Sequence, residues 1–311
     1  YSLAISDLLL APVTPSNTAR GGAIVHPVMR AIAGSFDSDP EKGTEGKIGK
    51  YLALVNYHAN IICCSLFITA TAPNPLVVDL ISKATGAQIS ISWGMWATAM
   101  LLPALVALVL MPIILYYLYP PEIKHTPNAT GFAKERLKEM GPMSRGEWIM
   151  LAIFGLLLLL WAGIPAMIFG PAAAVDATTT AFIGLSLLLL TGVLTWDDVL
   201  KEKSAWDTIT WFAALVMMAD LLSKLGLVGW LATSVGSAID HLGVHWSVAT
   251  LLLILLYVYS HYFFASTTAH ITAMFAAFFA AGLGLGAPPA LLGLMLGFSS
   301  SLMMGWKMSV S

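Results

Sequence analysis

The sequence carries one short polar pattern twice, as Pro15-Ser16-Asn17-Thr18-Ala19-Arg20 and, 250 positions later, as Ala265-Ser266-Thr267-Thr268-Ala269-His270. Each copy has a serine, an asparagine or threonine, a threonine, an alanine and then a basic residue. Two apolar arms flank each copy, in residues 1–30 and 247–285. We call the copies tip 1 (residues 15–20) and tip 2 (residues 265–270), and the fold is predicted outward from them.

The composition around the tips is that of a protein in a lipid bilayer. Of 311 residues, 58% are hydrophobic and 10% are charged, whereas a soluble chain has about 25% charged residues. The formal net charge of −2 offers no basic surface to nucleic acid. The two cysteines, Cys63 and Cys64, are neighbours, so they cannot form the disulfide framework of a secreted domain. We therefore expect an all-α integral membrane protein.

Several stretches almost free of charge are long enough to cross a bilayer, which takes about 20 apolar residues. Single crossings are predicted at Tyr51–Lys83, Ile91–Tyr119, Glu147–Ile168, Ala177–Thr195 and Thr208–Leu225. Three loops between the spans hold 11 of the 15 Lys and Arg residues. Loops rich in these residues stay in the cytoplasm, which orients a multi-pass protein.

In this topology each tip lies between loops on one side of the membrane. Apolar arms on both sides of a polar turn, with both ends on one face, predict a re-entrant hairpin. Non-helical backbone is tolerated at membrane depth only where it is buried in protein or lines a water-filled cavity. Tip 1 enters from the cytoplasm and tip 2 from outside. That is the arrangement of inverted-repeat transporters, which hold a substrate near the midplane.

The side chains of the tips suit an anion. Their hydroxyl and amide groups donate hydrogen bonds, and the N-termini of broken helices add free N–H groups. Leu8–Ala19 is about 18 Å of helix, which places Arg20 near the bilayer centre, where a charge costs at least about 2.5–3.5 kcal/mol. An anionic substrate is the expected partner. Taken singly, these residues also fit simpler roles. Ser16-Asn17-Thr18 could only cap a helix, Arg20 could extend to a lipid headgroup, and His270 could be a core histidine.

A second polar segment follows tip 1. Asn56-Tyr57-His58-Ala59-Asn60 precedes a break at Thr69-Ala70-Thr71-Ala72-Pro73-Asn74-Pro75. Two prolines in three residues do not continue an α-helix, because each lacks an N–H group and clashes with the preceding turn. Residues 51–85 are therefore predicted to be a discontinuous span whose loop exposes backbone carbonyls and Asn74. A simple proline kink is the alternative.

These motifs, Val13–Gly22 and Thr69–Pro75 above all, resemble the divalent anion:sodium symporter (DASS) family. The resemblance covers residues 1–304 and is closest to its bacterial citrate/succinate and tartrate/succinate antiporters and its plastid 2-oxoglutarate/malate translocators. It implies a homodimer that carries di- and tricarboxylates (succinate, malate, 2-oxoglutarate, tartrate or citrate) by an elevator motion, here in a bacterial inner (plasma) membrane. The residues implied to bind substrate are Ser16, Asn17, Thr18, Arg20, Thr71, Pro73, Asn74, Ser266, Thr267, Thr268 and His270.

The resemblance also implies a mode of coupling. Sodium-coupled members hold sodium on backbone carbonyls near these motifs, whereas the exchanger branch has cationic side chains beside the tips, as Arg20 and His270 are. Sodium-independent exchange, with no metal or cofactor, is therefore expected. A fixed cation gives a physical reason for exchange. A carrier without bound anion would have to move an uncompensated positive charge through a low-dielectric barrier. A sodium-coupled symporter is the alternative.

The chain departs from the family pattern at Thr267, where the pattern has asparagine, and at Ala72, where it has proline. The first tip and its break are 55 residues apart (Ser16 to Thr71), so the partner break would fall near position 321. A partial chain is expected, with about three N-terminal spans missing. Its predicted parts are first-repeat transport elements in 1–90, a scaffold span and cytoplasmic loop in 91–146, second-repeat spans in 147–225, the outward-entering hairpin with the start of the last broken span in 226–304, and an atypical tail in 305–311.

Two other classes of protein fit the sequence less well. A membrane-embedded metalloenzyme would use His241 and His245, which are spaced for one helix face, but no acid accompanies them and they fall in a predicted outer loop. A serine nucleophile at Ser16 or Ser266 lacks a positioned base. A channel needs no pair of hairpins of opposite sense. We therefore expect a carrier and not an enzyme.

Overall fold

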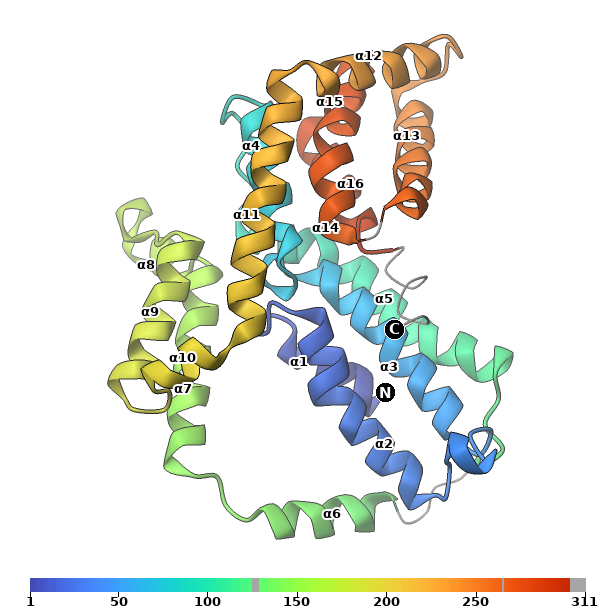
Figure 1. Ribbon diagram of the computed structural model, residues 1–311, viewed down its shortest axis with the longest axis vertical. Coiled ribbons are helices and arrows are strands. Elements are labelled where there is room, and N and C mark those ends of the chain that lie inside the picture. Colours follow the sequence, from blue (N-terminus) through green and yellow to red (C-terminus); the bar gives the residue numbers. More distant parts are fainter. Residues whose placement is uncertain (125–128, 265, 303–311) are drawn as a thin grey trace. The chain divides into compact units, whose positions relative to one another are not determined.

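The computed structural model describes residues 1–124, 129–264 and 266–302 (Figure 1). Every regular element in this described part is an α-, 3-10 or π-helix, which confirms the all-α prediction. The predicted tail at 305–311 lies outside the described residues. The chain divides into two compact units, of which the first gathers Tyr1–Val25, Asn56–Met111 and Ser204–Ser311 and the second His26–Val55 and Pro112–Lys203. The five-part division expected from the sequence stays a prediction.

The first unit contains the break predicted in residues 51–85. Helix α3 (Gly49–Leu66) ends before the 3-10 turn η3 (Ile68–Ala70), and α4 (Pro73–Ala84) begins at the first proline. Proline is tolerated in the first turn of a helix, where its missing N–H group has no intrahelical partner. The segment is therefore a discontinuous helix, and the alternative of a simple kink is wrong. Helix α5 (Trp93–Leu118) follows.

The segments around the two tips have the same order of elements, all in the first unit except α2. In the first, α1 (Ser2–Leu10) precedes tip 1, which leads into the π-helix η1 (Ala19–Val25) and α2 (His26–Ser35). In the second, α13 (Trp246–Ser260) and η5 (His261–Phe263) precede tip 2, which leads through α14 (Thr267–His270) into the π-helix η6 (Ile271–Phe275) and α15 (Ala276–Gly284). The repeat read from the sequence is thus repeated in structure, down to the π-helical turn after each tip.

The core of the first unit joins elements of both repeats. Helix α4 of the first repeat packs against η6, α15 and α16 (Pro289–Ser299) of the second. The Trp96 ring is fully buried there and donates from Nε1 to the Ser65 carbonyl at 2.8 Å. Gly297 of α16 lies so close that a Cβ would meet Trp96 Cη2 at 2.8 Å. Dense packing of this kind holds the break and tip 2 in one body.

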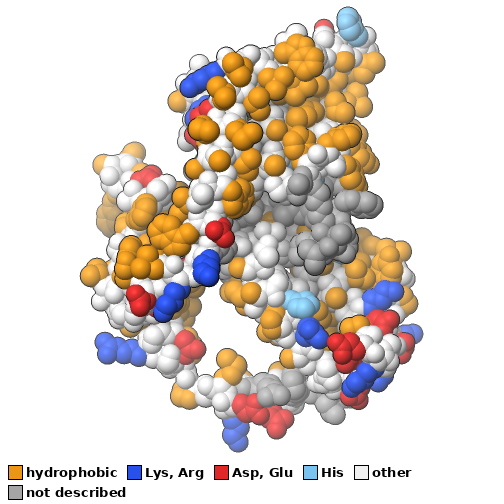
Figure 2. Space-filling model, in the orientation of Figure 1, with side chains coloured by type: hydrophobic (Ala, Val, Ile, Leu, Met, Phe, Trp, Pro, Cys, Tyr) orange, Lys and Arg blue, Asp and Glu red, His pale blue; other side chains and the backbone are white. Residues whose placement is uncertain are grey.

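Four helical stretches in the described residues are long and apolar enough to cross a membrane: Trp93–Leu118, Ala205–Lys224, Trp246–Phe263 and Thr267–Gly284. Helix α11 (Lys203–Lys224) contains the second stretch, and α12 (Leu227–Asp240) follows it after Gly226. Figure 2 shows hydrophobic side chains over the surfaces of α11, α12 and α13. Both arms of tip 2 reach the length of a spanning helix, and their re-entrant course stays a prediction.

The second unit is made of shorter helices than the sequence predicts. It holds η2 (Pro40–Lys42), α6 (Ala129–Met140), α7 (Arg145–Trp161), α8 (Ile164–Phe169), η4 (Pro171–Ala173), α9 (Ala177–Leu190) and α10 (Trp196–Lys201). The span predicted at Glu147–Ile168 is divided at Gly163, which has φ +74°, a conformation open to glycine. Helices α7 and α9 pack together around Leu157 and Leu188.

Candidate functional site

Tip 1 is built as a helix N-cap. The Ser16 hydroxyl oxygen accepts a hydrogen bond from the Ala19 amide at 3.2 Å, and the Ser16 carbonyl accepts one from the Arg20 amide at 2.9 Å. A serine in this position satisfies N–H groups that a helix start leaves unpaired. Thr18 is exposed, and Ser16 and Asn17 are half-buried. The polar groups of tip 1 are therefore within reach of a ligand.

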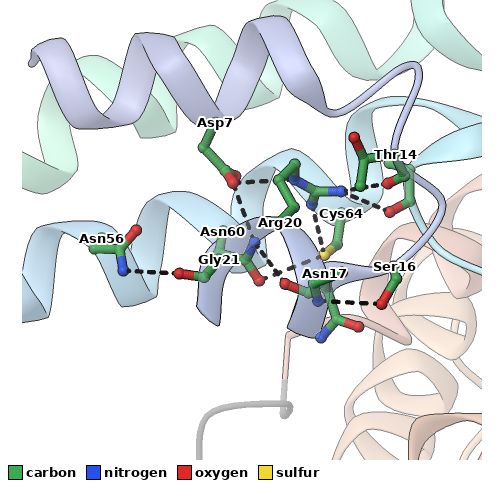
Figure 3. A network of polar contacts seen from close by, with 11 residues as sticks. Asp7, Thr14, Ser16, Asn17, Arg20, Gly21, Asn56, Asn60 and Cys64 are labelled. Atoms are coloured by element: carbon green, nitrogen blue, oxygen red, sulfur yellow. Dashed lines mark hydrogen bonds and ion pairs between the residues drawn. The ribbon is translucent and has the colours of Figure 1, made fainter. Parts of the chain in front are cut away.

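Arg20, the last residue of tip 1, is fully buried, and its side chain donates four hydrogen bonds (Figure 3). Its Nε donates to Asp7 Oδ1 at 3.0 Å, and its Nη1 donates to the carbonyls of Thr14 and Ala70, both at 2.9 Å. Its Nη2 donates to Cys64 Sγ at 3.2 Å. The guanidinium thus ties one arm of the hairpin, the turn before tip 1 and the break to one another.

Asp7 takes the place of the anionic partner that the sequence predicts for Arg20. The cost of burying Arg20 suggests an anionic substrate as its partner, but the carboxylate of Asp7, itself fully buried, supplies the opposite charge within the protein. Asp7 is the only acid in α1 and stands 13 residues before Arg20. A lone carboxylate in an apolar helix is a signal that sequence analysis passed over. Direct contact between Arg20 and a substrate stays a prediction.

Asn60 of α3 extends the network around Arg20. Its Nδ2 donates to Asp7 Oδ1 at 3.1 Å and to the Asn17 carbonyl at 3.2 Å. Gly21 passes so close that a Cβ there would meet Asn60 Nδ2 at 2.8 Å. One turn earlier on α3, Asn56 donates from Nδ2 to the Gly21 carbonyl at 3.3 Å. The asparagines of the second polar segment therefore hold tip 1 from behind (Figure 3).

The break is closed by its own side chains. Asn74 is 1% exposed, and its Nδ2 donates to the carbonyls of Cys64 at 2.8 Å and Phe67 at 2.9 Å. The prediction that the break exposes Asn74 is therefore wrong, because the amide satisfies carbonyls that the end of α3 leaves unpaired. Thr71 and Pro73 are buried beside it. The hydroxyl of Thr69 donates to the Pro12 carbonyl at 2.6 Å, which fastens the break to the hairpin.

Tip 2 repeats the cap of tip 1. The Ser266 hydroxyl oxygen accepts from the Ala269 amide at 3.1 Å, and the Ser266 carbonyl accepts from the His270 amide at 3.0 Å. Ser266 is exposed, Thr267 is half-buried and Thr268 is buried. Ala265 of the repeated pattern lies outside the described residues. The two serines that the sequence aligned therefore perform the same local role.

His270 is fully buried, like Arg20, but its surroundings are aromatic. Its Nε2 lies 2.8 Å from the Ser260 hydroxyl oxygen. The ring centroid of Tyr257 is 4.4 Å from that of His270, and the His261 ring is 4.8 Å away. The Tyr257 hydroxyl lies 2.8 Å from the Ser300 hydroxyl. No carboxylate forms an ion pair with His270 among the described residues.

The structure connects the predicted site residues through the break. Arg20 of tip 1 bonds to the Ala70 carbonyl, just before the break residues Thr71, Pro73 and Asn74. Helix α4, which begins at Pro73, packs against η6, which begins directly after His270. The break therefore lies between the supports of the two tips. The sequence pattern predicts the tips, the break and a polar segment that contains Asn60, but it gives Asn60 no role at tip 1 and does not single out Asp7 or Tyr257.

The histidine pair of the enzyme alternative does not form a helix face. Helix α12 ends at Asp240, and Gly243 has φ +60° in the loop that follows. His245 caps α13, with Nδ1 2.9 Å from the Ser247 hydroxyl. In the described part of the chain, no three His, Cys, Asp or Glu side chains are grouped to hold a metal ion. The i, i+4 geometry proposed for metal binding is therefore absent at these residues.

In the described residues all regular structure is helical, several helices are long and apolar, and two capped polar tips occupy corresponding positions, which is the architecture of an integral membrane transporter. The chain belongs to the family described as the sodium:sulfate symporter transmembrane region, whose model matches residues 1–308. The resemblance to the divalent anion:sodium symporters is thereby confirmed. The members of this family are transporters and not enzymes.

Named relatives agree with this membership. The chain is 50% identical over 302 residues to the "Putative malate transporter YflS" of Bacillus subtilis, with 97% of the chain and 61% of the relative aligned. It is 46% identical over 305 residues to the chloroplastic "Dicarboxylate transporter 1" of Spinacia oleracea, covering 98% of the chain and 52% of the relative. It is 39% identical over 301 residues to the inner membrane protein YbhI of Escherichia coli, and the alignment covers 97% of the chain and 61% of that relative. The chain thus spans about half to three fifths of these relatives.

Proposed function

We propose that the protein carries dicarboxylate and tricarboxylate anions, of the succinate, malate, 2-oxoglutarate, tartrate and citrate class, across a membrane. The observation that carries the proposal is the pair of matching caps at Ser16 and Ser266, each followed by a buried basic side chain. Relatives named as malate and dicarboxylate transporters support the substrate class. A substrate with a carboxylate at each end could bind one carboxylate at each tip.

The tips recognise carboxylates by hydrogen bonds. Carboxylate oxygens accept from hydroxyl, amide and backbone N–H groups, which are abundant at a capped helix start. The proposed contacts in tip 1 are Ser16, Asn17 and Thr18, and those in tip 2 are Ser266, Thr267 and Thr268. Arg20, Thr71, Pro73, Asn74 and His270 complete the proposed site as groups behind the tips. The burial of these five residues agrees with a supporting role more than with full contact.

Sodium-independent exchange is the coupling mode we propose. Unwound backbone carbonyls are the groups that coordinate sodium in transporters with broken helices. In this protein the guanidinium of Arg20 already binds two of them, the carbonyls of Thr14 and Ala70. A sodium ion on the same oxygens would have to displace a buried, ion-paired arginine. Asp7 compensates the charge of Arg20, so an empty carrier would move less net charge through the membrane than the sequence alone suggests.

Transport in proteoliposomes tests this proposal. The protein expressed from its complete gene is reconstituted, and uptake of labelled succinate is measured while external sodium and internal dicarboxylate are varied separately. We expect uptake that requires internal dicarboxylate and ignores sodium. Absence of uptake for every di- and tricarboxylate, in vesicles that hold folded protein, would overturn the substrate class.

A sodium-coupled symporter is the second candidate, favoured by the description of the matching family. It predicts sodium-driven uptake into vesicles that contain no dicarboxylate. That result would leave the substrate class intact and overturn the exchange mode.

We also propose a homodimer and an elevator motion. Cross-linking in the membrane tests the homodimer, and labelling of single cysteines from each side of the membrane tests the elevator motion.

The cellular location is proposed as a bacterial inner (plasma) membrane. Relatives include an inner membrane protein of Escherichia coli and chloroplastic transporters of plants. Fractionation of cells that express the complete gene distinguishes these locations.

A further inference from the structure

The residue 13 positions before the basic residue contacts it in both repeats. In the first repeat this residue is Asp7, whose Oδ1 is 3.0 Å from Arg20 Nε. In the second it is Tyr257, whose ring centroid is 4.4 Å from that of His270. Asp7 and Tyr257 are themselves 250 positions apart, the same offset as the two tips. The two contacts are thus equivalent in the repeat but differ in charge.

We propose that this position sets the charge of each tip, and that Asp7 is the positioning residue that holds Arg20 and neutralises it. Tip 1 then offers a substrate hydrogen bonds without net charge. In tip 2 the equivalent place is filled by the uncharged ring of Tyr257, which packs against His270 and supplies no opposite charge. Selection of a dicarboxylate would depend on the number and geometry of donors and not on a bare cation.

The geometry gives Asp7 a directing role. The guanidinium is planar and its five N–H donors have fixed directions. Once Asp7 accepts from Nε, the plane is oriented so that Nη1 reaches both the Thr14 and Ala70 carbonyls. Asp7 therefore controls whether Arg20 joins tip 1 to the break. The same Asp7 oxygen accepts from Asn60, which also holds the Asn17 carbonyl.

The burial of the pair makes its charge decisive. Asp7 and Arg20 are both fully buried. Removing one partner of a buried pair leaves an uncompensated charge and is strongly destabilising, whereas removing both charges together can be nearly neutral. Asp7 and Arg20 should therefore be strongly coupled in stability, in a way that two independent side chains are not.

A double-mutant cycle tests the pairing without any transport measurement. The variants Asp7→Asn, Arg20→Gln and the double variant are made in the complete protein, and their thermal unfolding is followed in detergent. We expect the double variant to lose less stability than the sum of the two single variants. Additive losses would overturn the proposal. Asp79→Asn is the matched control, because Asp79 pairs with Lys83 at an exposed site.

A rescue variant separates charge from shape if Arg20→Gln does not fold. Asn60→Asp, added to Asp7→Asn, places a carboxylate beside the same guanidinium, because Asn60 Nδ2 is 3.1 Å from Asp7 Oδ1. We expect this second substitution to restore much of the melting temperature lost by Asp7→Asn. Asn60→Asp alone is the reference, because it also loses the hydrogen bond from Asn60 Nδ2 to the Asn17 carbonyl. If Asp7→Asn lowers the melting temperature as much in that background as in the unsubstituted protein, the charge of Asp7 is not what tip 1 requires.

A transport readout extends the test and rests on the proposed function. The ratio of the KM for succinate to the KM for citrate is measured at an alkaline pH where both acids are fully ionised. Asp7→Asn leaves the Arg20 guanidinium without its counter-charge behind tip 1, so we expect the ratio to shift by about tenfold in favour of the trivalent anion. The double variant with Arg20→Gln should return it to the original value. An unchanged ratio in Asp7→Asn would overturn the charge-setting role, whereas absence of all uptake by the unsubstituted protein would count against the proposed function alone.

Discussion

Tip 1 and tip 2 share a backbone and differ in what stands behind it. Both tips are capped by a serine, at Ser16 and Ser266, and both lead into a π-helical turn. Behind tip 1 a buried ion pair joins four chain segments, whereas behind tip 2 an imidazole packs among aromatic rings. The two tips repeat in the caps that we propose to contact the substrate, and they differ in the side chains packed behind those caps.

This difference shows how two matching tips can rest on unlike supports. Hydrogen-bond directions at the two caps are set by the backbone and need the same serine in both. The support behind a tip needs only to be dense and to satisfy its buried polar groups, and an ion pair or a cluster of tilted rings meets that need. Substitutions should therefore affect the two tips alike at the caps and unlike behind them.

Arg20→Ala is the substitution expected to have the largest effect. It leaves the Asp7 carboxylate buried without its partner and removes the bonds to the Thr14 and Ala70 carbonyls. Breaking a buried pair by removal of one partner costs about 3–5 kcal/mol. Thermal unfolding of the complete protein in detergent measures the loss. Arg30→Ala, at an exposed position of α2, is the control and should change little. A loss no greater than that of the control would show that the ion pair does not support tip 1.

Gly21→Ala should have the next largest effect, and only tip 1 has this requirement. The added Cβ would lie 2.8 Å from Asn60 Nδ2, so Asn60 must move away from Asp7 and the Asn17 carbonyl. Overpacking of this kind costs about 1–3 kcal/mol. The corresponding residue directly after tip 2 is Ile271, which already carries a Cβ. Gly22→Ala is the control, because a Cβ there meets nothing within 4 Å. Equal melting temperatures for the two variants would contradict the close approach.

Ser16→Ala and Ser266→Ala test the part that the tips share. Each removes one cap bond to a backbone amide, which is worth about 1 kcal/mol, and each removes a proposed donor to the substrate. We expect both variants to raise the KM for succinate by about tenfold, and by similar factors. Ser35→Ala, at an exposed position of α2, is the control. A large effect at one serine and none at the other would break the equivalence of the tips.

The sequence predicts the shared part of the site better than the part that differs. The caps and the break were predictable because Ser16, Ser266 and Pro73 act on backbone groups within a few residues. The Asp7–Arg20 pair spans 13 residues and an unwound turn, so its geometry depends on how the hairpin folds back. The burial of Asn74 likewise depends on the path of the chain through the break. The repeat offset still carried a usable signal, since Asp7 and Tyr257 occupy matching positions.

Tyr257→Phe should have the smallest effect and is the sharpest test of the comparison. It keeps the ring that packs 4.4 Å from His270 and removes only the hydroxyl, which lies 2.8 Å from the Ser300 hydroxyl. Ser300 still donates to the Leu296 carbonyl, so the loss should be about 1 kcal/mol. Thermal unfolding measures it, with Tyr259→Phe at an exposed position as the control. If the support of tip 2 depends on shape, Tyr257→Phe stays far milder than Arg20→Ala. A loss as large as that of Arg20→Ala would show that a polar network supports tip 2 as well. Both tips would then depend on buried polar contacts, made by different residues.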